Sequence, residues 1–267
     1  MAKGPTDMAP HPDDHLFARE LAEEAGALLL RLRNQAGPDV DVASLRAQGD
    51  RESHLLLMAR LAAGRPDDAV LSEEGSDDAT RLSAKRVWII DPLDGTREFG
   101  EVPRDDWAVH VALWQEGDIV AGAVARPARG DTLATDRALP ATSQPREAHD
   151  TPLRLAVSRS RPPAFVNRLA HRLGAELVPM GSAGIKATAV IDGSVDAYVH
   201  AGGQYEWDSA APVAVARAAG LHTSRIDGSP LEYNCRNPLL PDLVICRPEV
   251  AQRLLTAIEE IIDEETT

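Results

Sequence analysis

Apolar residues recur at a helical spacing in two segments near the start of the chain. From about residue 13 to Leu32 they fall every three or four positions, which predicts a helix with one buried face. A second helix is expected to open at Asp50, a residue type that caps helices, and to stop at the Gly-Arg-Pro of residues 64–66. Residues 1–12 lack this pattern, so we expect them to be disordered.

Short apolar runs then predict a first set of strands. Glu116-Gly117 lies between the last two runs and is expected to turn a hairpin. Residues 136–152 are poor in large apolar side chains and rich in Pro, Ala, Ser and charge, which indicates a connector. The predicted strands cover residues 68–74, 86–91, 107–114 and 118–126.

Strands and helices alternate in the second half of the chain, which predicts an α/β layer packed beside the first half. The expected fold class is therefore α/β, with an α+β half followed by an α/β half. We expect two domains, residues 1–145 and residues 146–267, and a chain of 267 residues is long enough for a sizeable core. The predicted strands are 153–158, 176–180, 196–200 and 242–246, and the predicted helices are 162–173, 184–192, 208–219 and 248–263.

Charge and cysteine content narrow the class of protein. The chain has 28 basic and 42 acidic residues, a formal charge of −14, which argues against nucleic acid or an anionic membrane surface as a partner. Cys235 and Cys246 make neither a disulfide framework nor a zinc motif, as expected in a reducing cytoplasm. No signal peptide and no run of about 18 apolar residues is present, so we expect a soluble cytoplasmic protein.

Candidate chemistry begins where the strand Val87–Ile90 ends in Asp91. Pro92 removes a backbone donor and stops the strand, and the resulting turn brings Asp91 and Asp94 toward one point. Glu73 follows the first predicted strand, and Asp208 precedes an Ala-rich helix. A lone acid in such a place is more often a solvated turn or a helix cap. The Asp-Pro-Leu-Asp-Gly-Thr run is more specific, because it combines two carboxylates, a turn and a Gly-Thr.

If these carboxylates meet, they need cations. Two like charges about 4 Å apart repel by about 4 kcal/mol at an effective dielectric of about 20. Oxygen ligands suit Mg²⁺, or Mn²⁺ as an alternative, rather than Zn²⁺. Gly95 and Thr96 would then offer backbone donors and a hydroxyl to a phosphate oxygen or an attacking water. Of the eight histidines, only His11 and His15 have a His-x-x-x-His spacing, at the very start of the chain, and we expect no ligand or general-base role for any of the eight.

In order along the chain, Glu73-Glu74, the Asp-Pro-x-Asp-Gly-Thr of residues 91–96 and Trp207-Asp208 resemble the signature of the inositol monophosphatase superfamily. The resemblance covers about residues 50–240. Members are Mg²⁺-dependent, lithium-sensitive phosphatases. The resemblance therefore implies a layered α-β-α-β-α sandwich and a homodimer.

Several shorter segments are most similar to one branch of that family, the bisphosphate nucleotidases, which hydrolyse 3'-phosphoadenosine 5'-phosphate to AMP and phosphate in sulfate assimilation. Inositol phosphatases usually have Asn-Phe where this chain has Glu98-Phe99. A broader phosphatase for inositol monophosphate or fructose 1,6-bisphosphate is one alternative. A non-catalytic sensor that binds phosphonucleotides is another, and the intact acidic set with Thr96 argues against it. The similar segments are 97–99, 157–160, 181–182 with Lys186, 206–208 and 237–238.

The resemblance also implies roles for individual residues. The segment that relatives write Val-Thr-x-x-Asp reads 46–50 here and lacks the Thr. The Ser-Ser-Leu-Lys of relatives reads Ser-Ala-Gly-Ile-Lys at residues 182–186. Two or three Mg²⁺ ions are expected. The implied catalytic residues are Glu73, Asp91 and Thr96; the metal ligands are Glu73, Asp91, the Leu93 carbonyl, Asp94 and Asp208, with Asp50 at a third, weaker site; and the substrate contacts are Asp94, Gly95, Thr96, Ser158, Arg159, Ser160, Ser182, Lys186, Glu206 and Asp208.

Overall fold

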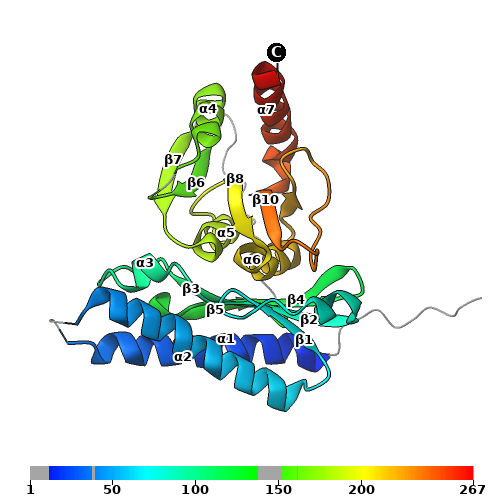
Figure 1. Ribbon diagram of the computed structural model, residues 1–267. Helices are drawn as coiled ribbons and strands as arrows, with labels where there is room; N and C mark the ends of the chain where they lie inside the picture. Colours follow the sequence, from blue (N-terminus) through cyan, green and yellow to red (C-terminus); the bar gives the residue numbers. More distant parts are fainter. Residues whose placement is uncertain (1–11, 38–39, 138–151, 161, 267) are drawn as a thin grey trace, which may run out of the picture.

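Five layers stack in the order helix, sheet, helix, sheet, helix (Figure 1). The computed structural model describes residues 12–37, 40–137, 152–160 and 162–266. This arrangement confirms the expected α-β-α-β-α sandwich. The segments predicted to be disordered, residues 1–12, and to form a connector, residues 136–152, lie almost wholly outside the described residues.

Helices α1 (Pro12–Gln35) and α2 (Val42–Gly64) form the first layer. The prediction that the second helix opens at Asp50 was wrong. Asp41 is the cap, since its carboxylate accepts a hydrogen bond from the Ser44 amide at 2.9 Å. The first two turns were missed because part of the buried face of α2 consists of small residues: a side chain at Gly49 would come within 2.8 Å of the Phe99 ring.

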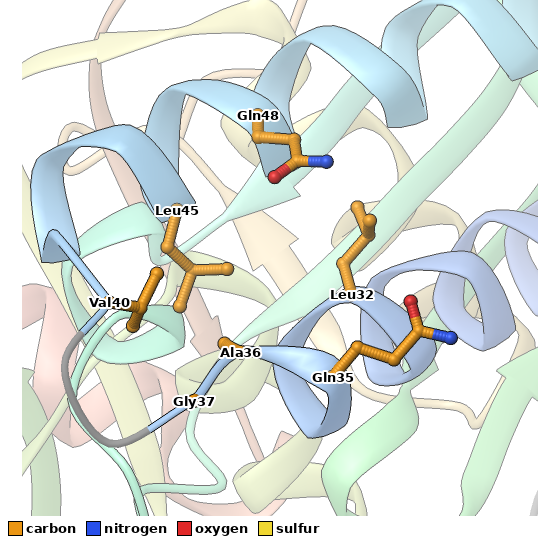
Figure 2. Close-up of a pocket in the computed structure, with 7 residues that line it drawn as sticks. All are labelled: Leu32, Gln35, Ala36, Gly37, Val40, Leu45 and Gln48. Atoms are coloured by element: carbon orange, nitrogen blue, oxygen red, sulfur yellow. The ribbon is translucent and has the colours of Figure 1, made fainter.

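A cavity of about 460 Å³ lies where the end of α1 faces the start of α2 (Figure 2). It is lined mainly by apolar side chains. None of the predicted catalytic, metal or substrate residues lines it. The lining residues are Leu32, Gln35, Ala36, Gly37, Val40, Leu45 and Gln48.

The first sheet has the strand order β1-β2-β3-β4-β5, with β1 parallel to β2 and the other pairs antiparallel. Strand β2 is buried on both faces, as predicted: Trp88 and Ile90 pack toward α1 and α2, and Val87 and Ile89 pack toward the middle layer. Strand β5 is only four residues long and was not predicted. The strands are β1 (Ala69–Ser72), β2 (Arg86–Asp94), β3 (Ala108–Gln115), β4 (Asp118–Arg126) and β5 (Asp131–Ala134), with short helices η1 (Ala79–Ser83), α3 (Thr96–Phe99) and η2 (Pro127–Arg129) between them.

The second sheet has the strand order β7-β6-β8-β10-β9. Strand β6 runs parallel to both of its neighbours, β7 and β8, whereas β10 runs antiparallel to both of its neighbours, β8 and β9. Strand β8 continues five residues past the predicted end at His200, through Gly202 and Gly203, both of which have positive φ. The three-residue strand β9 was not predicted. The strands are β6 (Arg154–Ser158), β7 (Glu176–Met180), β8 (Ala197–Tyr205), β9 (His222–Ser224) and β10 (Leu239–Cys246).

Helices α5 (Ala183–Ile191) and α6 (Glu206–Ala218) lie between the two sheets, and α4 (Ala164–Leu173) and α7 (Pro248–Thr266) cover the outer face (Figure 1). Small residues let α6 approach the first sheet, because a side chain at Gly122 would come within 2.6 Å of Ala214. One apolar core includes residues of β1–β5 together with residues of α5, α6, β8 and β10. The first sheet and this middle layer therefore share a core, and a domain boundary at residue 145 remains a proposal. Within the described residues, no helix is both long and apolar enough to cross a membrane.

Candidate metal centre and active site

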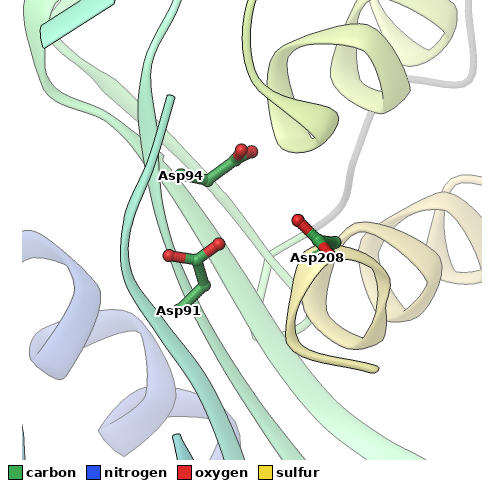
Figure 3. A group of neighbouring side chains, drawn as sticks. All are labelled: Asp91, Asp94 and Asp208. Atoms are coloured by element: carbon green, nitrogen blue, oxygen red, sulfur yellow. The ribbon is translucent and has the colours of Figure 1, made fainter. Parts of the chain in front are cut away.

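Three carboxylates converge where β2 ends against the start of α6 (Figure 3). Asp91, Asp94 and Asp208 each offer one oxygen atom within 4.8 Å of the others. The prediction that Pro92 ends the strand was wrong, since β2 runs through Pro92 to Asp94. A shift in the β2–β3 register between Asp91 and Asp94, rather than a turn, points both toward the same place. Asp208 comes from the first turn of α6. The structure therefore brings together residues that lie 117 positions apart in the sequence.

Asp94 is the carboxylate that the protein itself stabilises. It accepts hydrogen bonds from the Ser182 hydroxyl and, at 2.8 Å, from the Gly184 amide, and its Oδ2 lies 3.1 Å from Nε2 of His110. Burial favours the neutral acid, but His110, Lys186 and Ser182 outweigh it and hold the pKa of Asp94 below its ordinary value. Asp94 is therefore ionised without a metal.

Asp91 has weaker compensation, since the nearest cationic group, Nδ1 of His110, lies 4.0 Å from its Oδ2. Its carboxylate is 1% exposed, and one of its oxygens accepts from the Leu93 amide at 3.0 Å. Burial, together with the charges of Glu73, Asp94 and Asp208, raises the pKa of Asp91 well above its ordinary value. Burial and Asp94 likewise raise the pKa of Asp208 to about 6. A buried set of oxygen donors that resist ionisation fits a divalent cation, which removes both the desolvation cost and the repulsion.

Glu73 lies in the loop after β1 and does not belong to the three-carboxylate group. Its amide donates to the Ile90 carbonyl at 3.3 Å, and its carboxyl group is within hydrogen-bonding reach of Asp91. Burial of the carboxyl group, with Asp208, Asp94 and Glu74 nearby, raises the pKa of Glu73 to about 7. Glu73 therefore stands beside Asp91, at the exposed edge of the site.

A second group of oxygens surrounds the Thr96 hydroxyl. Thr96 Oγ1 lies 3.0 Å from the Leu93 carbonyl oxygen and 3.1 Å from Asp50 Oδ1. Burial and the charge of Glu74 raise the pKa of Asp50 to about 6. Gly95 has φ 87°, and a side chain there would approach the Asp106 carbonyl at 3.2 Å. Asp50, the Leu93 carbonyl and Thr96 thus lie together, and a third metal site at Asp50 stays a prediction.

The two positively charged residues among the predicted substrate contacts, Arg159 and Lys186, already donate hydrogen bonds within the protein. The Arg159 guanidinium donates to Glu98 at 2.7 Å and to Glu101 at 2.8 Å. Lys186 is buried, donates to the Ser182 carbonyl at 2.5 Å and lies 5.3 Å above the Tyr198 ring. Burial lowers the pKa of Lys186, against the charges of Asp94 and Asp208 that raise it. Lys186 therefore lies in the field of the acidic group, whereas Arg159 lies beyond it.

The remaining predicted substrate contacts differ in their surroundings. Both Glu206 oxygens accept backbone hydrogen bonds, from the Asn234 amide at 2.7 Å and the Cys235 amide at 2.8 Å. Ser158 ends β6 and is half-buried, and Ser160 is exposed just beyond it. A substrate role for these three stays a prediction.

The sequence analysis expected no ligand or general-base role for histidine, and it did not anticipate that His110 contacts the acidic group. It is fully buried on β3, with Nδ1 3.1 Å from the Trp207 carbonyl and Nε2 beside Asp94, in a contact that is electrostatic rather than a well-aligned hydrogen bond. Gly184 packs against this ring, since a side chain at residue 184 would overlap Nε2. The available signal was a histidine at the centre of the apolar strand predicted over residues 107–114.

Comparison with known proteins identifies relatives of this chain. The chain is 54% identical over 242 residues to the 3'-phosphoadenosine 5'-phosphate phosphatase of Mycobacterium tuberculosis (strain CDC 1551 / Oshkosh), a match that covers 89% of this chain and 90% of that protein. It is 30% identical over 236 residues to the 3'(2'),5'-bisphosphate nucleotidase CysQ of Escherichia coli (strain K12). That match covers 83% of this chain and 94% of the relative.

Among solved structures, CysQ from Bacteroides thetaiotaomicron, described as a bacterial member of the inositol monophosphatase family, superposes with a TM-score of 0.73. That match has 27% sequence identity and covers 88% of this chain and 97% of that one. The family model described as the inositol monophosphatase family matches residues 14–263. Because this match runs from the first helix to the last, the chain belongs to the inositol monophosphatase family.

Proposed function

We propose that this protein is a Mg²⁺-dependent phosphatase that hydrolyses the 3'-phosphate of 3'-phosphoadenosine 5'-phosphate, giving AMP and phosphate, in the turnover of sulfonucleotides. The observation that carries the proposal is the group of Asp91, Asp94 and Asp208 beside the Thr96 hydroxyl. The choice of substrate rests on the likeness to relatives named for that nucleotide.

The residues that would hold two Mg²⁺ ions are Glu73, Asp91, the Leu93 carbonyl, Asp94 and Asp208, and Asp50 would serve a third ion. The donors are all oxygen, and their raised pKa values at Asp91 and Asp208 mark an excess of negative charge. When bound, the ions would lower the pKa of a water and neutralise charge that develops on the leaving oxygen.

The chain's own groups would align that water. Thr96 Oγ1 can give its proton to the Leu93 carbonyl or to Asp50, which leaves its lone pairs free to accept from a water. Glu73, whose carboxyl group is within hydrogen-bonding reach of Asp91, would orient the same water. Gly95 leaves room for a phosphate oxygen to approach the backbone.

Substrate choice is tested by kcat/KM for phosphate release from 3'-phosphoadenosine 5'-phosphate, inositol 1-phosphate and fructose 1,6-bisphosphate. We expect the nucleotide to be the best substrate, and release from it to cease in chelator. A preference for either sugar phosphate would favour the broader phosphatase instead. Tight binding of the nucleotide without hydrolysis would favour the sensor.

Arg159 and Lys186 are expected to serve different phosphates. Arg159→Gln should lower kcat/KM about tenfold with 3'-phosphoadenosine 5'-phosphate and little with 3'-AMP, because a charge-assisted contact contributes about 1.5 to 3 kcal/mol and only the first nucleotide has a 5'-phosphate. Lys186→Met should reduce both equally, since Lys186 lies near Asp94.

The matched control for Arg159 is Arg172→Gln, because Arg172 also bridges two glutamates, Glu260 and Glu264, and is equally exposed. It should leave both rates unchanged. Equal losses on the two nucleotides for Arg159→Gln would remove Arg159 from the 5'-phosphate site.

We also propose a cytoplasmic homodimer inhibited by lithium. The homodimer and the lithium inhibition rest on the resemblance to the family. Sedimentation of the purified protein gives the oligomeric state. Complete insensitivity to millimolar lithium at low Mg²⁺ would count against that part of the proposal.

A further inference from the structure

One buried cation outside the metal centre has no part in the chemistry above. Arg81 lies in η1, nine residues after the end of β1 at Ser72, and is 1% exposed. Its guanidinium forms a two-point contact with Asp77, at 2.6 Å from Nε and 3.0 Å from Nη2. Asp77 belongs to the same loop as Glu73. The loop that carries Glu73 therefore folds back onto Arg81.

Arg81 also reaches across to the second half of the chain. Its Nη1 donates to Oδ1 of Asn234 at 2.7 Å, and its Nη2 donates to the Cys235 carbonyl at 2.9 Å. The Asn234 side-chain amide returns a hydrogen bond to the Arg81 carbonyl at 3.3 Å. Three hydrogen bonds therefore hold residues 234–235 to Arg81 of η1.

The same two residues are fastened to α6. The amides of Asn234 and Cys235 donate to the two oxygens of Glu206, at 2.7 and 2.8 Å. Glu206 is 1% exposed and is the first residue of α6, two positions before Asp208. A continuous chain of polar contacts thus runs from the Glu73 loop, through Arg81 and residues 234–235, to the helix that carries Asp208.

We propose that Arg81 is a positioning residue for the metal centre: with Asn234 and Glu206, it fixes the Glu73 loop relative to the start of α6 and so sets the affinity for divalent metal. The inference rests on the proposed metal site. It follows from the geometry. The planar guanidinium of Arg81 donates hydrogen bonds to Asp77, Asn234 and Cys235 at the same time, and a buried network whose donors all have acceptors keeps these segments in a single relative position. Without the fork, Glu73 and Asp208 would sample a wider range of separations.

The test compares Arg81→Lys with Arg126→Lys in the full-length protein. Lysine keeps the charge but cannot reach Asp77, Asn234 and Cys235 together. Arg126 is the matched control: it is also buried and bridges Asp131 and Asp192, outside the metal centre. Mn²⁺ binding is measured by calorimetry well below the melting temperature, and the rise in melting temperature with Mg²⁺ is measured separately.

Arg81→Lys should weaken Mn²⁺ binding about tenfold, a loss of about 1.4 kcal/mol, with kcat at saturating Mg²⁺ nearly retained. Arg126→Lys should lower the melting temperature by about as much as Arg81→Lys does, but it should leave the Mn²⁺ affinity unchanged. Asn234→Gly is a second variant, since residue 234 has φ 60°, which glycine adopts readily, and the change removes only the side-chain contacts. It should weaken binding in the same direction.

Two results would overturn the inference. In the first, both Arg81→Lys and Asn234→Gly bind Mn²⁺ as tightly as the wild type. In the second, Arg126→Lys weakens binding as much as Arg81→Lys does, which makes the effect one of general stability. If the wild type itself binds no Mn²⁺ or Mg²⁺, the proposed metal site fails, and the inference fails with it.

Discussion

Asp208→Asn is expected to abolish phosphate release and, in chelator, to make the protein more stable. Loss of a metal ligand removes several kcal/mol of transition-state stabilisation, and a loss of about 4 kcal/mol lowers kcat about a thousandfold. Burial and Asp94 raise the pKa of Asp208 to about 6, so its ionised form is costly at neutral pH. Asparagine removes that cost, about 3 kcal/mol at about pH 8, and can still accept from the Tyr205 amide, which lies 2.7 Å from Asp208.

Asp94→Asn is the comparison that makes this result specific. It should abolish activity equally but destabilise the metal-free protein, because Asp94 is held ionised by His110, Lys186 and Ser182. Removing one partner of such a buried pair costs about 3 kcal/mol. Thermal unfolding in chelator measures both variants. Shifts of the same sign, or near-normal phosphate release by either variant, would contradict this account of the site.

The metal-free protein is expected to lose stability as the pH rises from about 4 to 7. The pKa values of Asp50, Glu73 and Asp208 are raised to about 6, 7 and 6, from ordinary values of 3.8, 4.5 and 3.8. In that window the folded state holds more protons than the unfolded state, so the free energy of unfolding falls with rising pH. The loss is about 3 kcal/mol after a discount for the exposure of Glu73 and Asp50.

That loss corresponds to a fall of about 8 °C in melting temperature for a chain of this size. Saturating Mg²⁺ should abolish the fall, because the bound ions favour the ionised carboxylates. Melting curves at about pH 5 and about pH 8, each with chelator or with Mg²⁺, test the sign. A metal-free protein that becomes more stable toward pH 8 would show that folding does not raise the pKa values of these carboxylates.

The sequence predicts the acidic centre well because its signals are local. Asp91 and Asp94 lie only three positions apart, and the register shift between them in β2 brings both carboxylates to one point. The layers follow in the same way from apolar runs and helical periods. The first turns of α2 were missed because Leu45 and Gly49 are their only buried residues, and glycine at the second of these positions leaves no apolar stripe to recognise.

Partners across the chain are what the sequence does not give. Arg159 reads as a free cation in its own segment, and only the fold brings Glu98 and Glu101 against it. His110 has no histidine at a ligand-like spacing, and its neighbour Asp94 is reached through strand pairing. The Arg81 network depends on residues 153 positions apart, which no local pattern encodes.

The central claim is tested most directly by identifying the products formed from 3'-phosphoadenosine 5'-phosphate by the wild type, with Mg²⁺ and with chelator. The account predicts one phosphate and AMP that retains its 5'-phosphate, with neither formed in chelator. Release of the 5'-phosphate to leave 3'-AMP, or hydrolysis that continues at the same rate in chelator, would contradict it.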